Sequence, residues 1–134
     1  MKISPYLSFN GNCSEVIALY EKVFNVKATV MHYKDAPPDS GYQAPPGTED
    51  FIMHASLEIG AETIMMSDMP TGYHVTVGNN ITLTVEFGDA DAAKAAFDIL
   101  KEGGKVEMEL QETFWSKCFG TLCDKFGVNW NISV

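Results

Sequence analysis

Basic residues are scarce in this chain. Its 134 residues include only 9 lysines and arginines against 18 aspartates and glutamates, which gives a formal net charge of −9 at pH 7. Binding to nucleic acid or to an anionic membrane surface depends on a positively charged face of the protein. The charge balance therefore argues against both of these partners.

Cysteine is also scarce, and long hydrophobic runs are absent. Cys13, Cys118 and Cys123 are odd in number, and their spacing matches no paired zinc motif. A catalytic thiol is one interpretation, but small buried apolar side chains fit the pattern better. Reduced thiols are typical of the cytosol. Because we find neither a signal peptide nor an apolar segment long enough to span a bilayer, we expect a cytoplasmic protein.

The chain has the length and composition of one globular domain. Its hydrophobic content of 46% and charged content of 20% are ordinary, and 134 residues are enough to bury a core. Asn12 and Glu15 resemble a capping box at the start of a helix of about three turns. Apolar periodicity predicts a strand, this helix and three further strands in the first half, over residues 3–9, 12–24, 27–34, 51–59 and 62–68.

Two proline pairs interrupt this pattern. Pro37-Pro38 and Pro45-Pro46 cannot lie in a central strand, so residues 35–50 are expected to form a loop of about 16 residues. A loop of this length is either a lid or binding segment, or simply mobile. The sequence leaves both interpretations open.

The second half repeats the first. After a linker over 69–79, alternation predicts a strand over 80–87, and Asp89 can cap a helix that ends at Gly103-Gly104. Three strands follow, the first over 105–112. Phe9 corresponds to Phe87 at an offset of 78, and the helix anchors Val16, Tyr20 and Val23 correspond to Ala93, Phe97 and Leu100 at an offset of 77. This self-similarity indicates a duplicated βαβββ module.

Short sequence motifs along nearly the whole chain point to a known family. They include Pro5-Tyr6-Leu7-x-Phe9-x-Gly11, Met53-His54-Ala55, Met65-Met66-Ser67-Asp68, Gly103-Gly104-Lys105-Val106, Leu110-Gln111-Glu112-Thr113-Phe114-Trp115 and Asp124-Lys125-Phe126-Gly127-Val128-x-Trp130. With these motifs the chain resembles the vicinal oxygen chelate superfamily, also called the glyoxalase/bleomycin-resistance/dioxygenase fold. The similarity is greatest to its PhnB-like branch, whose members often carry a 3-demethylubiquinone-9 3-methyltransferase label.

The resemblance implies a fold and an assembly. It predicts one α+β domain over 1–134, in which two βαβββ modules, about 1–68 and 80–134, form a curved mixed sheet around a concave pocket. Family members commonly form homodimers, so a homodimer is expected here. The methyltransferase label is the weakest of the functional hypotheses, because no glycine-rich strand–turn–helix loop for a nucleotide cofactor is present.

The same resemblance implies where a metal would bind. In metal-using members, His, Gln or Glu ligands lie on the first and last strands of each module. Here those positions fall at Ser4 or Pro5, Met65 or Met66, Asn80, and Asn131. Divalent ions prefer anionic oxygen or imidazole ligands. We therefore predict no metal at this site and no cofactor.

Two functional hypotheses follow. The first is a protein that binds a small molecule in the concave cleft without a metal. Its candidate contacts are Tyr6, His54, Ser67, Asp68, Asn80, Gln111, Thr113 and Trp115. The second is a metal-dependent enzyme of glyoxalase or dioxygenase type, with a relocated site around His54, Glu58 or Asp68.

Structural roles compete with these assignments. His54 could be bonded to a strand neighbour, Ser67 and Asp68 could simply end a strand, and Trp115 could pack in the core. Asp124 precedes a glycine-containing turn and is best interpreted as a residue that forms that turn.

Overall fold

The computed structural model describes residues 1–70 and 72–134. The chain divides into two compact units, Met1–Thr76 and Val77–Val134, each of which has its own sheet and its own α-helix. Most of the predicted linker lies within the described residues, but Thr71 lies outside them.

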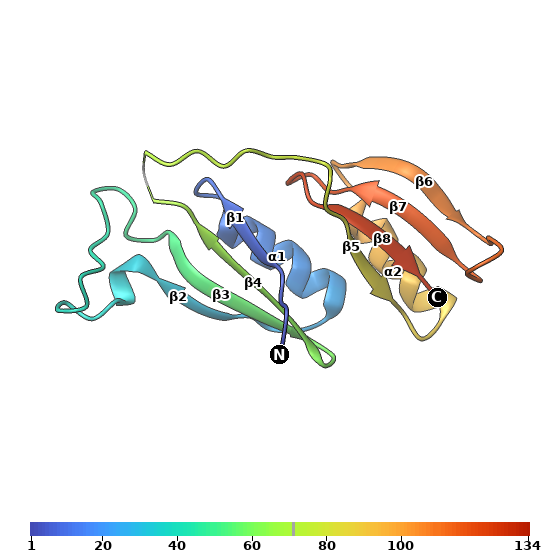
Figure 1. Cartoon of the computed structure of the whole chain (residues 1–134), viewed down its shortest axis with the longest axis horizontal. Coiled ribbons are helices and arrows are strands. Elements are labelled where there is room, and N and C mark those ends of the chain that lie inside the picture. The colour runs from blue at the N-terminus through green and yellow to red at the C-terminus, as the bar shows by residue number, and fades with distance from the viewer. Residues whose placement is uncertain (71) are drawn as a thin grey trace. The chain divides into compact units, whose positions relative to one another are not determined.

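The first unit contains a four-stranded mixed sheet in the order β1-β4-β3-β2 (Figure 1). β1 pairs with β4 in parallel, and the other neighbours are antiparallel. A short 3-10 helix follows β2. The elements are β1 (Tyr6–Phe9), α1 (Cys13–Phe24), β2 (Thr29–His32), the 3-10 helix (Tyr33–Asp35), β3 (Ile52–Ile59) and β4 (Glu62–Asp68).

The second unit repeats this topology. Its sheet has the order β5-β8-β7-β6, and β5 pairs with β8 in parallel. The elements are β5 (Leu83–Glu86), α2 (Ala90–Leu100), β6 (Lys105–Gln111), β7 (Phe119–Cys123) and β8 (Asn129–Ser133). The predicted α+β fold of two βαβββ modules is therefore confirmed, as two four-stranded mixed sheets.

Each unit has its own core, where the helix packs on one face of the sheet. α1 places its apolar side against β3 and β4, and α2 packs on β8. All six helix anchors aligned by the repeat are buried. Strand residues that are buried with them include Ala55, Leu57 and Met66 in the first unit and Leu122, Trp130 and Ile132 in the second. Burial of such side chains is the main stabilising term in a domain of this size.

The expected capping box at α1 is wrong. The Asn12 side chain makes no capping bond. Instead, the Asp68 carboxylate accepts hydrogen bonds from Gly11 N and Cys13 N, each at 2.9 Å. Parallel pairing of β1 with β4 brings Asp68 beside Phe9, so the cap comes from a strand that is distant in the sequence. The Asp89 cap is confirmed, since its Oδ1 accepts from Ala92 N at 2.8 Å.

Three strands are markedly shorter than the alternation predicts. β2 covers only Thr29–His32 of the predicted 27–34, because the chain turns into the 3-10 helix at Tyr33. β1 starts at Tyr6 because Pro5 has no N–H for the ladder, although its carbonyl accepts from Met65 N. β5 starts only at Leu83, because a bend at Asn79 and Asn80 precedes it. Ile81, which falls in the predicted strand 80–87, lies before β5 and is 73% exposed.

The proline-rich segment after the 3-10 helix is a loop, as predicted. Two turns shape it, with Ser40 N donating to Pro37 O and Thr48 N donating to Pro45 O. Its two ends are joined by Lys34 and Asp50, whose charged groups lie 2.7 Å apart. Across residues 1–70 and 72–134, every helix is too short or too polar to cross a membrane.

Candidate functional site

The first sheet has one face under α1 and one face that α1 does not cover. Side chains alternate between the two faces along each strand. Met66 pairs with Leu7 and Ala55 on the face under the helix, whereas Met65 pairs with Tyr6 and Ser56 on the other. We call this second face the open face. It carries Tyr6, Ser8, Thr29, Met31, His54, Ser56, Glu58, Thr63, Met65 and Ser67.

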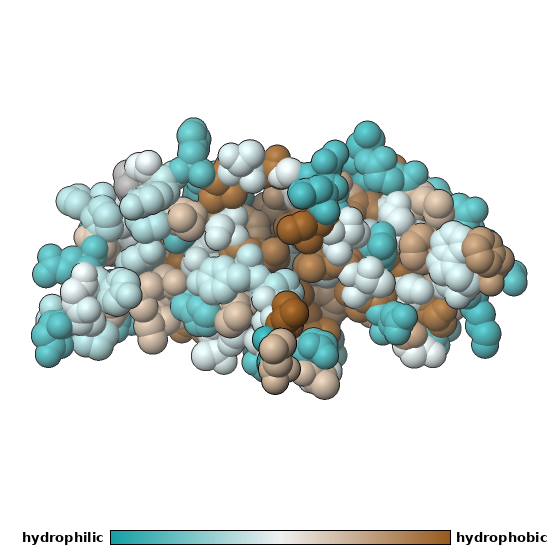
Figure 2. All heavy atoms as spheres, in the orientation of Figure 1, coloured by the Kyte–Doolittle hydropathy of each residue, from teal (hydrophilic) through white to brown (hydrophobic). Residues whose placement is uncertain are grey.

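The open face is of mixed polarity. In Figure 1 the strands of this unit are drawn in front of α1, so the same view in Figure 2 shows the face opposite the helix. Hydrophilic and hydrophobic residues are interspersed there. Tyr6 and Met31 are 48% and 43% exposed. Such a mixture suits recognition of a small organic molecule, which needs apolar contact together with a few polar groups.

Tyr6 and His54 are brought together across this face. The strand order places β4 between β1 and β3, so the two side chains meet above β4. The Tyr6 hydroxyl lies 3.3 Å from His54 Nδ1, and the ring centroids are 5.8 Å apart at an interplanar angle of 39°. Ser67 of β4 pairs with Ser8 of β1 and is 7% exposed. Three of the predicted contact residues, Tyr6, His54 and Ser67, thus share one face.

Tyr33 is a tyrosine of the 3-10 helix that the sequence interpretation did not consider. Burial raises the pKa of its phenol, and the nearby Asp68 raises it further. Its backbone N–H donates to Phe51 O at 3.0 Å, which joins the 3-10 helix to the residue before β3. Its position in the predicted strand 27–34 gave no functional signal.

Glu58 lies at the other end of the open face, with its carboxylate already bonded. Thr63 Oγ1 donates to Glu58 Oε2 at 2.7 Å, and Lys2 Nζ donates to Thr63 Oγ1 at 3.1 Å. His54 and Glu58 are four residues apart on β3, which corresponds to about 13 Å along an extended strand. The two therefore mark opposite ends of the face.

Asp68 lies on the face under α1, not on the open face. It is 2% exposed. In addition to the bonds from Gly11 N and Cys13 N, its second carboxylate oxygen accepts from Ile52 N at 2.9 Å. These bonds join the end of β4 to the start of α1 and the start of β3. The geometry favours a structural role for Asp68, and its contact with a ligand stays a prediction.

The predicted residues of the second unit are mostly exposed. Asn80 lies in the bend before β5, and Gln111 ends β6 with its amide donating to Glu109 O at 3.1 Å. Thr113 shapes the next turn, where its hydroxyl accepts from Ser116 N. Trp115 is 55% exposed and contacts Phe114 and Phe119 edge-on, at centroid distances of 4.7 and 5.3 Å. It is therefore not a core residue of this unit.

The turn-forming role of Asp124 is confirmed. Its Oδ1 accepts from Phe126 N at 2.9 Å and from Val128 N at 3.1 Å, and its Oδ2 accepts from Trp130 Nε1 at 2.9 Å. The carboxylate is 3% exposed. These bonds hold the β7–β8 turn and orient the buried Trp130.

The strand register shows which residues lie opposite two of the four positions inferred for a metal. Met65 pairs with Tyr6, and Asn131 pairs with Thr84 and donates to its hydroxyl at 3.2 Å. Ser4, Pro5 and Asn80 lie outside the strands, and their assignment as metal positions stays a prediction. A thioether, a phenol, a hydroxyl and an amide offer neither a carboxylate nor an imidazole. The divalent metal implied by the superfamily resemblance does not fit this set.

The relocated metal site is not formed either within the residues that the structure describes. Among residues 1–70 and 72–134, no group of three or more His, Cys, Asp or Glu side chains lies close enough to hold a metal ion. His54, Glu58 and Asp68 are separated by the length of β3 and by the two faces of the sheet.

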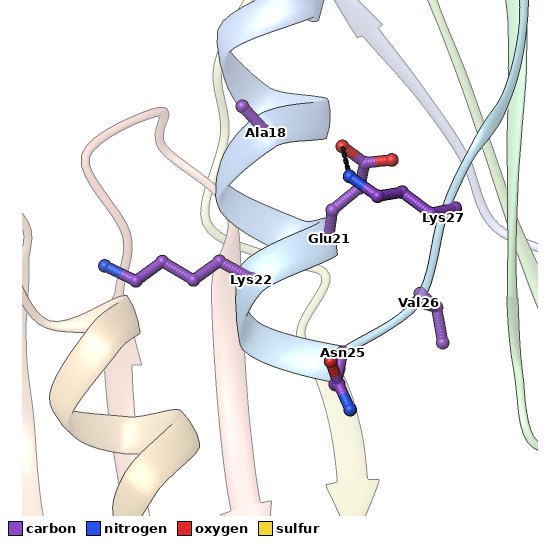
Figure 3. A pocket seen from close by; sticks show the side chains of 6 residues that line it. All are labelled: Ala18, Glu21, Lys22, Asn25, Val26 and Lys27. Carbon is purple, nitrogen blue, oxygen red and sulfur yellow. Dashed lines mark ion pairs between the residues drawn. The ribbon is translucent and has the colours of Figure 1, made fainter.

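A hollow of about 440 Å³ lies at the C-terminal end of α1 (Figure 3). Its polar groups serve the end of the helix. Glu21 accepts from Ala28 N at 2.9 Å and pairs with Lys27 at 3.8 Å, while Asn25 adopts the left-handed conformation that ends the helix. Lys22 extends away from the Glu21–Lys27 pair. None of the candidate contact residues lines this hollow.

Comparison with known proteins agrees with the motifs. A model of the family described as 3-demethylubiquinone-9 3-methyltransferase matches residues 1–133. The chain belongs to this PhnB-like family. It is 40% identical to protein YjdN of Escherichia coli K12, over 100% of the chain and 95% of YjdN. The family label names a reaction, but the match by itself assigns no reaction to this member.

Two solved structures of similar proteins have the same fold as this PhnB-like chain. Protein PA1353 from Pseudomonas aeruginosa is 33% identical, with a TM-score of 0.87 over 99% of this chain and 96% of PA1353. A putative 3-demethylubiquinone-9 3-methyltransferase, PhnB protein, from Bacillus cereus is 26% identical, with a TM-score of 0.79 over 99% and 98% of the two chains. The family predicted from the sequence is thereby confirmed.

Proposed function

We propose that this protein binds a small organic molecule on the open face of its first sheet, without a metal at the positions that metal-using relatives employ. The observation that carries the proposal is the Tyr6–His54 pair. It places a phenol and an imidazole on a sheet surface that α1 leaves uncovered, beside the side chains of Met31 and Met65. Apolar contact with a few convergent polar groups is the usual composition of a small-molecule site.

The metal-dependent alternative has less support from the geometry. Glu58 accepts from Thr63, and both carboxylate oxygens of Asp68 accept backbone N–H groups under α1. His54 is the one member of that proposed set whose partner, Tyr6, is another candidate contact. This arrangement favours binding over metal-assisted chemistry.

A ligand screen tests the proposal. The protein is labelled with 15N, and its amide spectrum is recorded with a panel of aromatic and dicarbonyl compounds, before and after treatment with a chelator. We expect hits to shift resonances of β1, β3 and β4, to raise the unfolding midpoint, and to bind equally after chelation. Tyr6→Ala and His54→Ala should weaken binding at least tenfold, whereas Glu102→Ala, at an exposed position in the second unit, should leave it unchanged.

Two outcomes would overturn the proposal. One is stoichiometric metal in protein purified without a chelator or affinity tag, with ligand binding lost on its removal. The other is a panel that leaves the open-face resonances unmoved. The homodimer and the cytoplasmic location expected from the sequence remain proposals, which light scattering and cell fractionation would check.

A further inference from the structure

The Tyr6–His54 contact involves one particular ring nitrogen. The phenol oxygen lies 3.3 Å from Nδ1. A neutral imidazole carries one proton, so one nitrogen donates and the other accepts. If Nδ1 accepts from Tyr6, the proton lies on Nε2. If Nδ1 donates, Nε2 becomes an acceptor. The direction of this single hydrogen bond therefore decides what His54 can offer a ligand.

The chemistry of the two groups favours Tyr6 as the donor. The lone pairs of a phenol oxygen are drawn into the ring, which makes the hydroxyl a better donor than acceptor. The lone pair of an unprotonated imidazole nitrogen lies in the ring plane and is a strong acceptor. Tyr6 lies on β1 and His54 on β3, and both strands pair with β4. This pairing fixes the backbone positions of the two residues.

The strand neighbours of the Tyr6–His54 pair are flexible, uncharged methionine side chains. Met31 pairs with His54 on β2, and Met65 pairs with Tyr6 on β4. Thioether side chains adapt to flat aromatic surfaces. The carboxylate of the same face, Glu58, lies at its far end and accepts from Thr63. The net charge of −9 disfavours an anionic ligand, and the distance of Glu58 from the pair leaves a cationic ligand without a counter-charge from that side chain.

We propose that Tyr6 is a positioning residue that holds His54 as a donor through Nε2–H, and that the ligand class is an uncharged, flat, conjugated ring bearing a carbonyl oxygen. This inference rests on the proposed binding function and narrows it. The carbonyl accepts from Nε2–H while the ring packs against the methionine side chains. Tyr6 acts through His54, so its removal should change selectivity for the carbonyl more than contact with the ring.

The first test needs no ligand. Nitrogen NMR of protein labelled in its histidine rings reports the tautomer of His54, assigned by comparison with His54→Gln. At a pH where the ring is neutral, we expect Nδ1 unprotonated and Nε2 protonated. Tyr6→Phe should move the ring toward a mixture of tautomers. Tyr42→Phe is the matched control, since Tyr42 is 66% exposed and lies in the loop. A wild-type ring protonated mainly on Nδ1, or no response to Tyr6→Phe, would overturn the inference.

The second test compares two probes of one shape, 4-methoxyacetophenone and 4-ethylanisole, which lacks the carbonyl. We expect the wild type to bind the ketone about tenfold more tightly, the gain typical of one well-placed hydrogen bond. In Tyr6→Phe most of that preference should be lost while both probes still bind. Equal binding of the two probes by the wild type refutes the carbonyl preference and leaves the binding function standing. Failure of both probes and of the whole panel refutes the binding function itself.

Discussion

The two units share one topology but hold their turns and termini by different polar contacts. In the first unit the buried carboxylate of Asp68 accepts from two separate segments, the start of α1 at Gly11 and Cys13 and the start of β3 at Ile52. In the second unit the buried carboxylate of Asp124 accepts from three groups within six residues of it, at Phe126, Val128 and Trp130. One carboxylate joins distant elements, and the other shapes a single turn.

The difference between these two carboxylates shows that the repeat extends to the apolar positions but not to the polar ones. Apolar helix and strand positions correspond in both units, because each helix must cover one face of its sheet. The polar anchors do not correspond. The residue that corresponds to Asp68 after β8 is Val134, and its main-chain oxygen accepts from the hydroxyl of Ser116 at 2.9 Å. The end of β8 is therefore held by the neutral hydroxyl of Ser116, whereas the end of β4 is held by the carboxylate of Asp68.

The faces opposite the helices differ as well. At corresponding register positions the first unit has Tyr6 beside Met65, and the second has Thr84 beside Asn131. The side-chain amide nitrogen of Asn131 donates to the hydroxyl of Thr84, so these two side chains bond to each other. Tyr6 instead reaches across β4 to His54. The same backbone therefore presents a phenol–imidazole pair in one unit and a hydroxyl–amide pair in the other.

The largest expected effect comes from the two buried carboxylates. Asp68→Asn puts an amide where three N–H groups need acceptors and should lower the free energy of unfolding by about 3–4 kcal/mol. Asp124→Asn should cost about 2 kcal/mol, because its turn is local and can readjust. Urea unfolding measures both, with Asp39→Asn on the exposed loop as the neutral control. A larger loss of unfolding free energy in Asp124→Asn than in Asp68→Asn would contradict the proposed difference between the two carboxylates.

A second prediction concerns close packing in the second unit. A Cβ at Gly104 would collide with the backbone carbonyl of Cys123, and a backbone group cannot rotate away as a side chain can. We expect Gly104→Ala to cost about 2–3 kcal/mol in thermal or urea unfolding. At Gly88 a Cβ meets no atom within 4 Å. Gly88→Ala should therefore be neutral or stabilising by up to about 1 kcal/mol, and equal losses at both glycines would contradict the packing argument.

The smallest effect is expected at Cys13 and depends on pH. Burial, and then the nearby charge of Asp68, raises the pKa of the Cys13 thiol from 9.0 to about 12. Because the folded-state pKa is the higher one, the stability from the neutral thiol is complete below about pH 9 and is lost as the pH rises toward 12. At about pH 10 the loss should be about 1.4 kcal/mol relative to neutral pH.

The second unit supplies the control for this prediction. The repeat aligns Cys13 with Ala90, so Cys13→Ala gives the first helix the residue of the second. Urea unfolding at about pH 7 and pH 10 should show a steeper decline for the wild type than for the variant. Parallel declines would contradict a thiol that titrates only on unfolding. In the folded protein, Cys13 should also react with thiol reagents far more slowly than the half-buried Cys123.

The sequence by itself determined the local elements and their repetition. Helix anchors such as Tyr20 and Phe97, the Asp89 cap and the Asp124 turn could all be predicted, because each depends on residues within one or two turns of chain. The sequence also showed that two of the positions inferred for a metal, Met65 and Asn131, carry no charged side chain. The motifs were sufficient to predict the family.

The tertiary structure decided which distant residues meet. Asp68 could not be predicted as the cap of α1, because only the parallel pairing of β1 with β4 brings it to Gly11 and Cys13. The Tyr6–His54 contact likewise depends on the strand order, which places β4 between the two residues. Strand alternation predicts the face on which a side chain lies. Register and strand order then determine its neighbours on that face, and these depend on contacts between residues far apart in the chain.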